Sequence, residues 1–405
     1  MHLLQNIFLF IVPFLLVITV VVTVHEFGHF LMAKRFGVAI DRFSIGFGRA
    51  VFARTDRDGV EWRIGWLPLG GYVRFAGDEN AASVPDKEDL ESLREHIVEE
   101  QGAAAVSRYY HFKPVWQRAL IAVAGPSANF ALAILLFAGL AMVFGQVRQD
   151  ARVGSVEPGS VAATVGFKSD DLILSMDGRP VRDFSDLPPY VGLRTGVPIR
   201  FEVQRGDQLL NITATPRKTT IEDKVAGRHT QGLLGLNGPL FKGPYTHHVR
   251  YNPIEAVGVG VNQTWRTVAT TSFYLGRLIT GKTSPDQLSG MIGMANATSA
   301  LTKESVEGTK TFGQAALSVS ANLLALIAFL SVGIGFMNLM PIPVLDGGHL
   351  VFYAYEAVAR RPLAASIQAV GYRLGLALLV GFMLFAGWND LHRYDVFKKL
   401  GELLF

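Results

Sequence analysis

The sequence contains no cysteine among its 405 residues. A chain without cysteine has no disulfide framework, no thiolate metal site and no cysteine nucleophile. Any metal that this protein binds must therefore be held by histidine, aspartate or glutamate.

Charged residues are the second shortage. They make up 18% of the chain, whereas a soluble protein carries about 25%. The deficit is concentrated in long apolar segments, and the mean hydropathy is +0.28, which is typical of a membrane protein. The net charge of +4 comes from basic residues beside apolar segments. This placement favours membrane lipid, and argues against nucleic acid, as their partner.

Four segments are long enough to cross a hydrocarbon core, which takes about 20 helical residues. They cover residues 7–32, 119–144, 317–340 and 370–388. The first segment has no basic stretch before it and no small-residue cleavage site after it, so we interpret it as a retained span rather than a secretory signal. The sequence therefore predicts an α-helical polytopic membrane protein with four transmembrane helices.

Basic residues indicate the orientation of these helices. They cluster in the connection between the first two spans and in the one between the last two, so the positive-inside bias places both connections in the cytoplasm. The residues are Lys34, Arg35, Arg42, Arg49, Lys113, Arg118, Arg360 and Arg361. Both termini and the long segment between spans two and three are then extracytoplasmic, although Lys398 and Lys399 argue weakly against this.

The connecting segments contain further structure. Residues 60–67 and 71–75 are β-type runs around Pro-Leu-Gly-Gly, which predicts a hairpin. Residues 150–240 contain alternating runs between turn signals and one short helical stretch, which predicts a soluble, mostly β segment. Residues 251–280 place apolar side chains at helical spacing, which predicts an amphipathic helix that lies on the membrane surface or packs on the neighbouring domain.

The first span contains HEFGH, which fits the pattern H-E-x-x-H. On a helix, His25 and His29 share a face and can bind one Zn²⁺, while Glu26 can take a proton from a water on that metal. Ionisable groups near a bilayer centre cost at least about 2.5 kcal/mol each on insertion scales. A bound metal offsets this cost, so we prefer a metal site over polar side chains that reach toward the interface.

Catalytic zinc usually has three protein ligands and one open position. The best third ligand is Asp346 in NLMPIPVLDGGHL, where two prolines break the helix and a Gly-Gly pair allows close backbone approach. His349 is the competing ligand, although a position beside the metal site suits it better.

The motifs HEFGH, GPSAN at 125–129 and NLMPIPVLDGG occur in this order, together with FSIGFG at 43–48 and PLGGYV at 68–73. In this order they resemble the site-2 protease family of intramembrane zinc metalloproteases, and within it the bacterial branch of the regulator of sigma-E protease. The resemblance covers nearly the whole chain.

The resemblance implies roles for particular residues. His25, His29 and Asp346 match the zinc ligands of the family, and Glu26 matches its general base. Further positions match substrate contacts and the ligand loop of a circularly permuted PDZ domain. The substrate contacts are Asn338, Pro341, Pro343, Gly70, Gly71 and Tyr72, and the PDZ residues are Leu233, Gly235 and Leu236.

The resemblance also completes the predicted organisation, with one extracytoplasmic α+β PDZ domain where many members of the branch have two. The predicted parts are transmembrane helices at 1–34, 117–145, 311–346 and 369–390; cytoplasmic loops at 35–116, which holds the membrane-associated hairpin, and at 347–368; the PDZ domain at 146–240; an amphipathic helix with a linker at 241–310; and a tail at 391–405.

The implied activity is peptide-bond hydrolysis inside the bacterial inner membrane, near its cytoplasmic side. The expected substrates are single-span proteins already trimmed outside the membrane, such as anti-sigma factors, or remnant signal peptides. A new peptide C-terminus is a possible ligand of the PDZ domain. Two alternatives remain from the residues alone. A metal transporter predicts metal flux without cleavage, and a non-catalytic PDZ scaffold predicts no effect of replacing His25.

Overall fold

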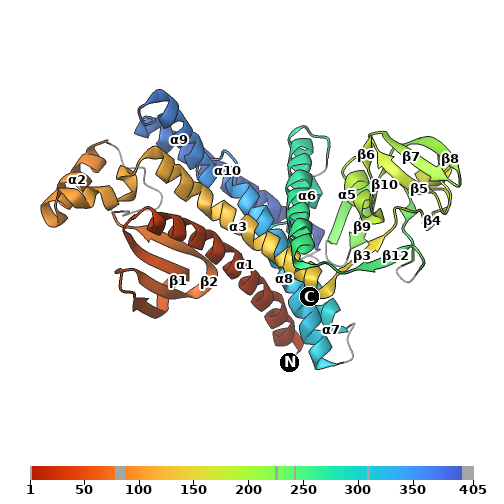
Figure 1. Ribbon diagram of the computed structural model, residues 1–405, viewed down its shortest axis with the longest axis horizontal. Helices are drawn as coiled ribbons and strands as arrows, with labels where there is room; N and C mark the ends of the chain where they lie inside the picture. The colour runs from red at the N-terminus through yellow and green to blue at the C-terminus, as the bar shows by residue number, and fades with distance from the viewer. Residues whose placement is uncertain are drawn as a thin grey trace, which may run out of the picture. The chain divides into compact units, whose positions relative to one another are not determined.

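The computed structural model describes residues 2–77, 87–223, 227–240, 243–283, 285–307 and 311–394. The predicted tail at 391–405 therefore lies mostly outside the described residues. The chain forms two compact units (Figure 1). Unit 1 contains residues 1–137 and 298–385, and unit 2 contains residues 138–297 and 386–405.

Unit 1 is a helical bundle that carries one β-hairpin. Helices α3, α7 and α10 begin in one unit and end in the other. The elements are α1 (His2–Arg35), β1 (Ile40–Thr55), β2 (Glu61–Phe75), α2 (Lys87–Gln101), the 3-10 turns Ala103–Arg108 and Tyr110–Phe112, α3 (Val115–Phe144), α7 (Met291–Glu307), α8 (Phe312–Asn338), α9 (Asp346–Ala359) and α10 (Ala365–Arg393).

Among the residues that the structure describes, four helices are long and apolar enough to cross a membrane, as predicted: α1 over Ile11–Arg35, and the whole of α3, α8 and α10. Large apolar side chains on these helices are exposed, for example Leu16, Leu135 and Phe329. In water such surfaces are unfavourable, whereas in a bilayer they face lipid. The chain is therefore an integral membrane protein.

Helices α1, α3 and α8 pack together through small and branched residues. Val17, Val21 and Ile327 form a buried core between α1 and α8. Further along α1, a Cβ on Gly28 would lie only 2.3 Å from the Ala124 carbonyl oxygen of α3. A glycine at this point lets the two backbones approach closely, which brings the middle of α3 to the HEFGH segment.

The hairpin differs from its prediction. The chain reverses direction between residues 64 and 71, as predicted, but the two runs do not pair with each other. Residues 61–64 and 71–74 of β2 instead pair with the same residues of β1, 42–45, and their registers run in opposite directions. Another turn lies at 56–60, where the Trp62 indole and two backbone N–H groups donate to the carboxylate of Asp56. These hydrogen bonds, the indole first, hold the pKa of Asp56 below its usual range. Glycine suits β2 here because a Cβ on Gly71 would lie 2.6 Å from the Ser44 carbonyl oxygen.

An aromatic cluster attaches the hairpin to the end of α1. The rings of Phe30 on α1, Phe43 on β1 and Trp62 on β2 have centroids 5.0–5.4 Å apart. Aromatic pairs at such distances contribute about 0.5–1.5 kcal/mol each beyond their buried area. Strand β2 then runs along α1, where the Thr19 hydroxyl donates to the Pro68 carbonyl at 2.6 Å.

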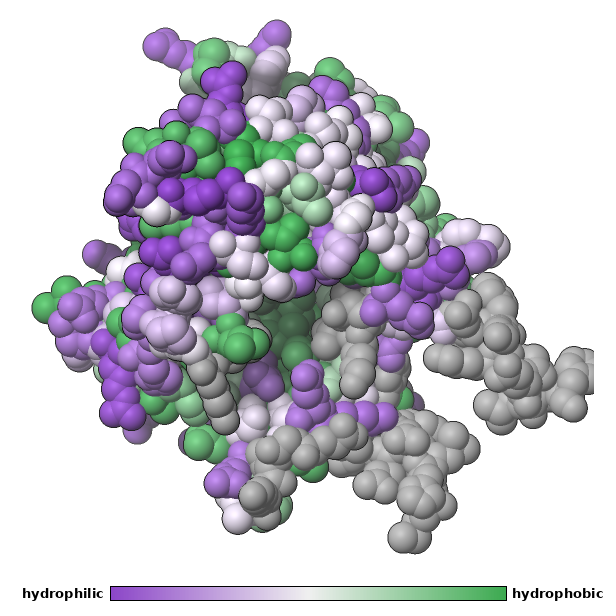
Figure 2. All heavy atoms as spheres, turned by 90° about the vertical axis from the view of Figure 1, so that its right-hand side faces the viewer, coloured by the Kyte–Doolittle hydropathy of each residue, from purple (hydrophilic) through white to green (hydrophobic). Residues whose placement is uncertain are grey.

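Unit 2 contains small sheets, of which the largest has the strand order β6-β5-β7-β8. Its core consists of buried aliphatic and aromatic side chains, among them Phe167, Ile173 and Phe201. Hydrophilic side chains cover most of the face that Figure 2 shows, with apolar ones in small groups. The elements are β3 (Gln146–Gln149), β4 (Ser155–Val156), α4 (Val161–Thr164), β5 (Leu172–Met176), β6 (Arg179–Pro180), α5 (Leu187–Gly192), β7 (Ile199–Arg205), β8 (Gln208–Ala214), β9 (Arg217–Asp223), β10 (Gly227–Leu233), β11 (Leu236–Asn237), β12 (Thr246–Val249), α6 (Pro253–Ile279) and the 3-10 turns Phe184–Asp186 and Pro285–Gln287.

The amphipathic helix predicted at 251–280 is α6, and its two faces differ. One face packs on the small domain, where Arg266 pairs with Asp186 and the Phe273 ring lies 4.2 Å from the Arg194 guanidinium. The other face exposes apolar residues at helical spacing: Ile254, Val257, Val261 and Trp265. One face of α6 thus packs on the neighbouring domain, and the other has the apolar side chains that suit a membrane surface. These are the two environments predicted for the helix.

Candidate active site

The two histidines of HEFGH lie one turn apart on α1 and point at the same place. His25 is buried, and its Nε2 lies 3.2 Å from Nε2 of His29. The four-residue interval puts both rings on one helix face. The local sequence therefore creates a pair of nitrogens that converge on one position.

Asp346 comes to this position from the other end of the chain. Helix α8 ends at Asn338, residues 339–345 form a non-helical turn, and α9 begins with Asp346. Its Oδ2 lies 3.1 Å from His25 Nε2 and 3.5 Å from His29 Nε2. Gly347 and Gly348 permit this turn. A Cβ on Gly347 would lie 2.3 Å from the carbonyl oxygen of residue 340, and a Cβ on Gly348 would lie 2.3 Å from that of residue 342.

The three groups fit a zinc ion. Their ligand atoms all lie within 4.8 Å of one another. Zinc bonds of ~2.0–2.1 Å at a tetrahedral angle place two ligand atoms about 3.3 Å apart, close to the 3.1–3.5 Å found here. Asp346 Oδ2 is also buried and makes no regular hydrogen bond to any described residue. Two imidazoles and one carboxylate suit zinc chemically and leave a fourth position open.

Helix α3 contacts both imidazoles. The Ile121 carbonyl lies 2.8 Å from His29 Nδ1. Because a carbonyl only accepts, Nδ1 carries the hydrogen and the Nε2 lone pair faces the site. The Asn129 amide lies 3.4 Å from His25 Nδ1. Gly125 lies between them, and a Cβ there would be 2.3 Å from His29 Nε2.

Glu26 lies beside the cluster and contacts the hairpin. The backbone N–H of Val73 donates to Glu26 Oε2 at 3.2 Å. Gly71 is also close, since its Cβ position lies 3.8 Å from Glu26 Cγ. The segment that contains Gly70, Gly71 and Tyr72 is therefore at the site, as part of β2.

The structure separates the three substrate residues proposed around α8. Asn338 reaches the cluster, with its Nδ2 3.4 Å from His25 Nε2. Pro341 is exposed. Pro343 faces α10 instead, where its Cδ would lie 3.3 Å from a Cβ on Gly375.

His349 does not join the three-residue cluster among the residues that the structure describes. The Tyr372 hydroxyl lies 3.2 Å from either nitrogen of its ring. Burial lowers the pKa of His349 because a charged ring loses hydration there. A neutral imidazole one turn beyond Asp346 fits a supporting position better than a ligand position.

The three proposed PDZ residues lie in unit 2, apart from the metal cluster. Leu233 ends β10, and Leu236 pairs with Val156 of β4. Gly235 has φ of 79°, and a Cβ there would lie 2.3 Å from the Ser160 side chain. Glycine is therefore required at this point of the loop.

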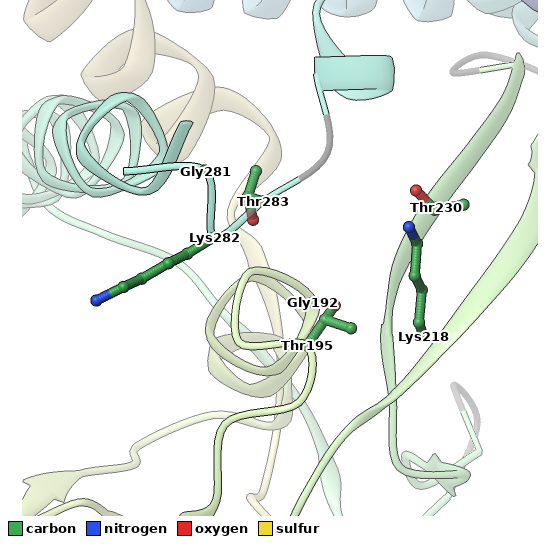
Figure 3. A pocket seen from close by; sticks show the side chains of 7 residues that line it. All are labelled: Gly192, Thr195, Lys218, Thr230, Gly281, Lys282 and Thr283. Atoms are coloured by element: carbon green, nitrogen blue, oxygen red, sulfur yellow. The ribbon is translucent and has the colours of Figure 1, made fainter. Parts of the chain in front are cut away.

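Unit 2 also holds a pocket of about 240 Å³ (Figure 3). In Figure 3, Lys218 and Thr230 line one side, while Lys282 points away from it. The full lining is Gly192, Thr195, Lys218, Thr230, Gly281, Lys282 and Thr283. This lining contains no carboxylate or imidazole, so the pocket suits an anion and not a metal ion.

Three contacts at the site were not assigned from the sequence. They come from the Ile121 carbonyl, the Asn129 amide and the Val73 N–H. The GPSAN motif at 125–129 marked the right part of α3 without showing what it touches. The two backbone groups leave no signal in a sequence.

Comparison with known proteins places these observations in context. Residues 13–382 match the model of peptidase family M50. The metalloprotease MmpA of Caulobacter vibrioides is 52% identical over 393 residues, which cover 97% of this chain and 98% of that protein. A protein of Agrobacterium fabrum, named as a zinc metalloprotease, is 41% identical over 382 residues, which cover 94% and 95%. Another of Rhizobium meliloti, named likewise, is 39% identical over 390 residues, which cover 96% and 98%.

Proposed function

This chain belongs to peptidase family M50, and from that premise we propose that it hydrolyses peptide bonds within transmembrane segments of single-span proteins. It is a zinc metalloprotease, so the metal transporter and the non-catalytic scaffold are no longer alternatives. The observation that carries the proposal is the position of His25 and His29 inside the apolar helix α1, with the carboxylate of Asp346 beside them. A peptide bond must come to this depth to be cut.

The residues around the cluster supply the steps of hydrolysis. His25, His29 and Asp346 would hold zinc, and the bound metal would supply Lewis-acid chemistry to a water molecule and to the scissile carbonyl. Glu26 accepts the proton of that water and passes it to the leaving amine. Asn338 beside His25 orients the substrate, because its amide can bond the backbone of an unwound segment.

Strand β2 presents the substrate to these groups. A helical substrate hides its peptide bonds in internal hydrogen bonds, and an edge strand can replace those bonds. The Val73 N–H points away from β1, because it donates to Glu26, so it belongs to the free edge. When a substrate carbonyl takes this N–H, Glu26 is released toward the water. Substrate binding and availability of the base are thus coupled through one donor.

Replacing Val73 with proline removes this donor. Proline is tolerated where an edge N–H faces outward, so we expect the hairpin to form and zinc to remain bound. Loss of one hydrogen bond to the neutral substrate carbonyl, about 0.5–1.5 kcal/mol, predicts cleavage of a transmembrane substrate slower by about 2- to 10-fold. Initial cleavage rates in detergent measure this. Val73→Ala, which keeps the N–H, is the matched control, and equal rates for the two variants would refute the role of the edge.

We propose that unit 2 contains one PDZ domain that binds a peptide C-terminus. The end of β10 lies beside the end of α5, where a Cβ on Gly232 would be 2.7 Å from the Val191 carbonyl. Lys218 in the adjoining pocket offers a positive charge, and backbone N–H groups can hold a carboxylate. A peptide with a free C-terminus should therefore bind more tightly than its amidated form, and equal binding would contradict the proposal.

The basic loops support a location in the bacterial inner membrane, with both termini and unit 2 outside the cytoplasm. The substrates are then single-span proteins shortened on that side, such as anti-sigma factors, or remnant signal peptides. The purified protein in lipid vesicles should cut a shortened span within its apolar stretch, and a chelator should stop the reaction. Mass spectrometry of the products locates the cut. Cleavage only outside the span would refute intramembrane proteolysis.

A further inference from the structure

The two histidines are held by a single face of α3. Ile121, Gly125 and Asn129 follow one another at four-residue intervals, so they lie on one side of that helix. His25 and His29 have the same interval on α1. His29 lies next to Ile121 and His25 next to Asn129, so the two intervals match. Gly125, between them, leaves room for the rings.

The two contacts differ in chemistry. The Ile121 carbonyl can only accept, whereas the Asn129 amide can donate through Nδ2 or accept through Oδ1. With Nδ2 toward the ring, His25 carries its hydrogen on Nε2, which lies 3.1 Å from Asp346 Oδ2. With Oδ1 toward the ring, the hydrogen lies on Nδ1 and the Nε2 lone pair is available to a metal.

Asn129 has no other partner that explains its position. Its side chain is fully buried, and its Oδ1 has no hydrogen-bond partner in the described part of the chain. An unsatisfied amide costs about 1–3 kcal/mol inside a protein, and a bilayer supplies no water to satisfy it. The neighbouring imidazole is the group that can offset this cost.

We infer that Asn129 is a positioning residue that sets the tautomer of His25. Its Oδ1 accepts from Nδ1–H of His25 while Nε2 of that ring binds zinc. The inference rests on the proposed role of His25 as a zinc ligand. Asn129 itself touches neither zinc nor substrate, so its effect appears in metal affinity before it appears in catalysis.

The test is a zinc titration of the full-length protein against a competing chelator. Asn129→Leu keeps the branched shape and the number of side-chain heavy atoms but removes the acceptor, so zinc should bind about 10- to 100-fold more weakly, the usual effect of losing a hydrogen bond to a metal-binding histidine. Asn129→Asp keeps an oxygen acceptor, so its zinc affinity should stay within a few-fold of wild type. Asn322→Leu is the matched control, because Asn322 bonds Ser305 on another pair of helices, and its zinc affinity should not change.

The order of the two variants separates positioning from packing. A buried aspartate destabilises a helix bundle more than a leucine does, so a purely structural role predicts weaker zinc binding for Asp than for Leu. The inference would be overturned if Asn129→Asp bound zinc more weakly than Asn129→Leu, or if Asn129→Leu bound zinc with wild-type affinity. His25→Ala distinguishes this failure from failure of the site. If His25→Ala retains wild-type zinc affinity, the assignment of His25 as a ligand is wrong. If His25→Ala loses zinc while Asn129→Leu keeps wild-type affinity, only the role of Asn129 is refuted.

Discussion

Glu26→Gln should abolish peptide hydrolysis while zinc stays bound. The amide keeps the shape of the side chain but cannot accept the proton of the attacking water. General acid–base catalysis contributes about 10²–10⁴-fold to a rate, so we expect a loss of that size. Cleavage of a fluorescent transmembrane substrate in detergent, with zinc content measured on the same samples, checks both parts.

An exposed glutamate far along the chain from Glu26 provides the control for Glu26→Gln. Glu95 lies exposed on α2, so Glu95→Gln makes the same chemical change outside the metal cluster and should cleave at the wild-type rate. If Glu26→Gln retained more than about a tenth of the wild-type rate, which is well above the loss expected of a general base, another group would have to be the base. Loss of zinc together with activity would instead show that Glu26 supports the metal site.

Asp346→Ala should remove both zinc and activity. Two histidines at 3.2 Å remain, but a catalytic zinc site usually needs three protein ligands. We expect zinc to bind on the order of 10²-fold more weakly or worse, which exceeds the usual effect of an outer hydrogen bond. Metal analysis after dialysis against a chelator, paired with the cleavage assay, measures the loss.

Asp207→Ala is the matched control for this experiment, because Asp207 is exposed in the turn between β7 and β8. It should keep zinc and activity. Wild-type zinc content in Asp346→Ala would remove Asp346 from the ligand set and make a third group, such as Asn338 beside His25, the next ligand to examine.

The sequence predicted the parts of the site that follow from spacing and hydropathy. The i, i+4 interval places His25 and His29 together on any helix, and long apolar runs identify the four spans. Asp346 could be predicted from the sequence because it is the first carboxylate after an apolar span that contains no ionisable group. In these cases a local pattern determines the result.

The pairing of the hairpin and the role of Asn129 were harder to predict from the sequence, because contacts with residues far away in the chain determine them. Pro-Leu-Gly-Gly marks the reversal within β2, but the sequence does not show that Phe47 and the Ser44 carbonyl lie against Gly70 and Gly71. The partner strand β1 determines this, and its importance is visible only after folding. Asn129 is one polar residue in an apolar helix, and only the position of α1 shows that it faces His25.

The distribution of the three proposed zinc ligands along the chain has a consequence for synthesis. Two ligands belong to the first helix, and the third follows more than three hundred residues later. At about 5–20 residues per second, the first pair waits roughly 15–60 s for its partner. A growing chain therefore has no complete hydrolytic centre until its third span has been made. If these three residues are the ligands, the protein is inactive as a hydrolase until the third span has been synthesised.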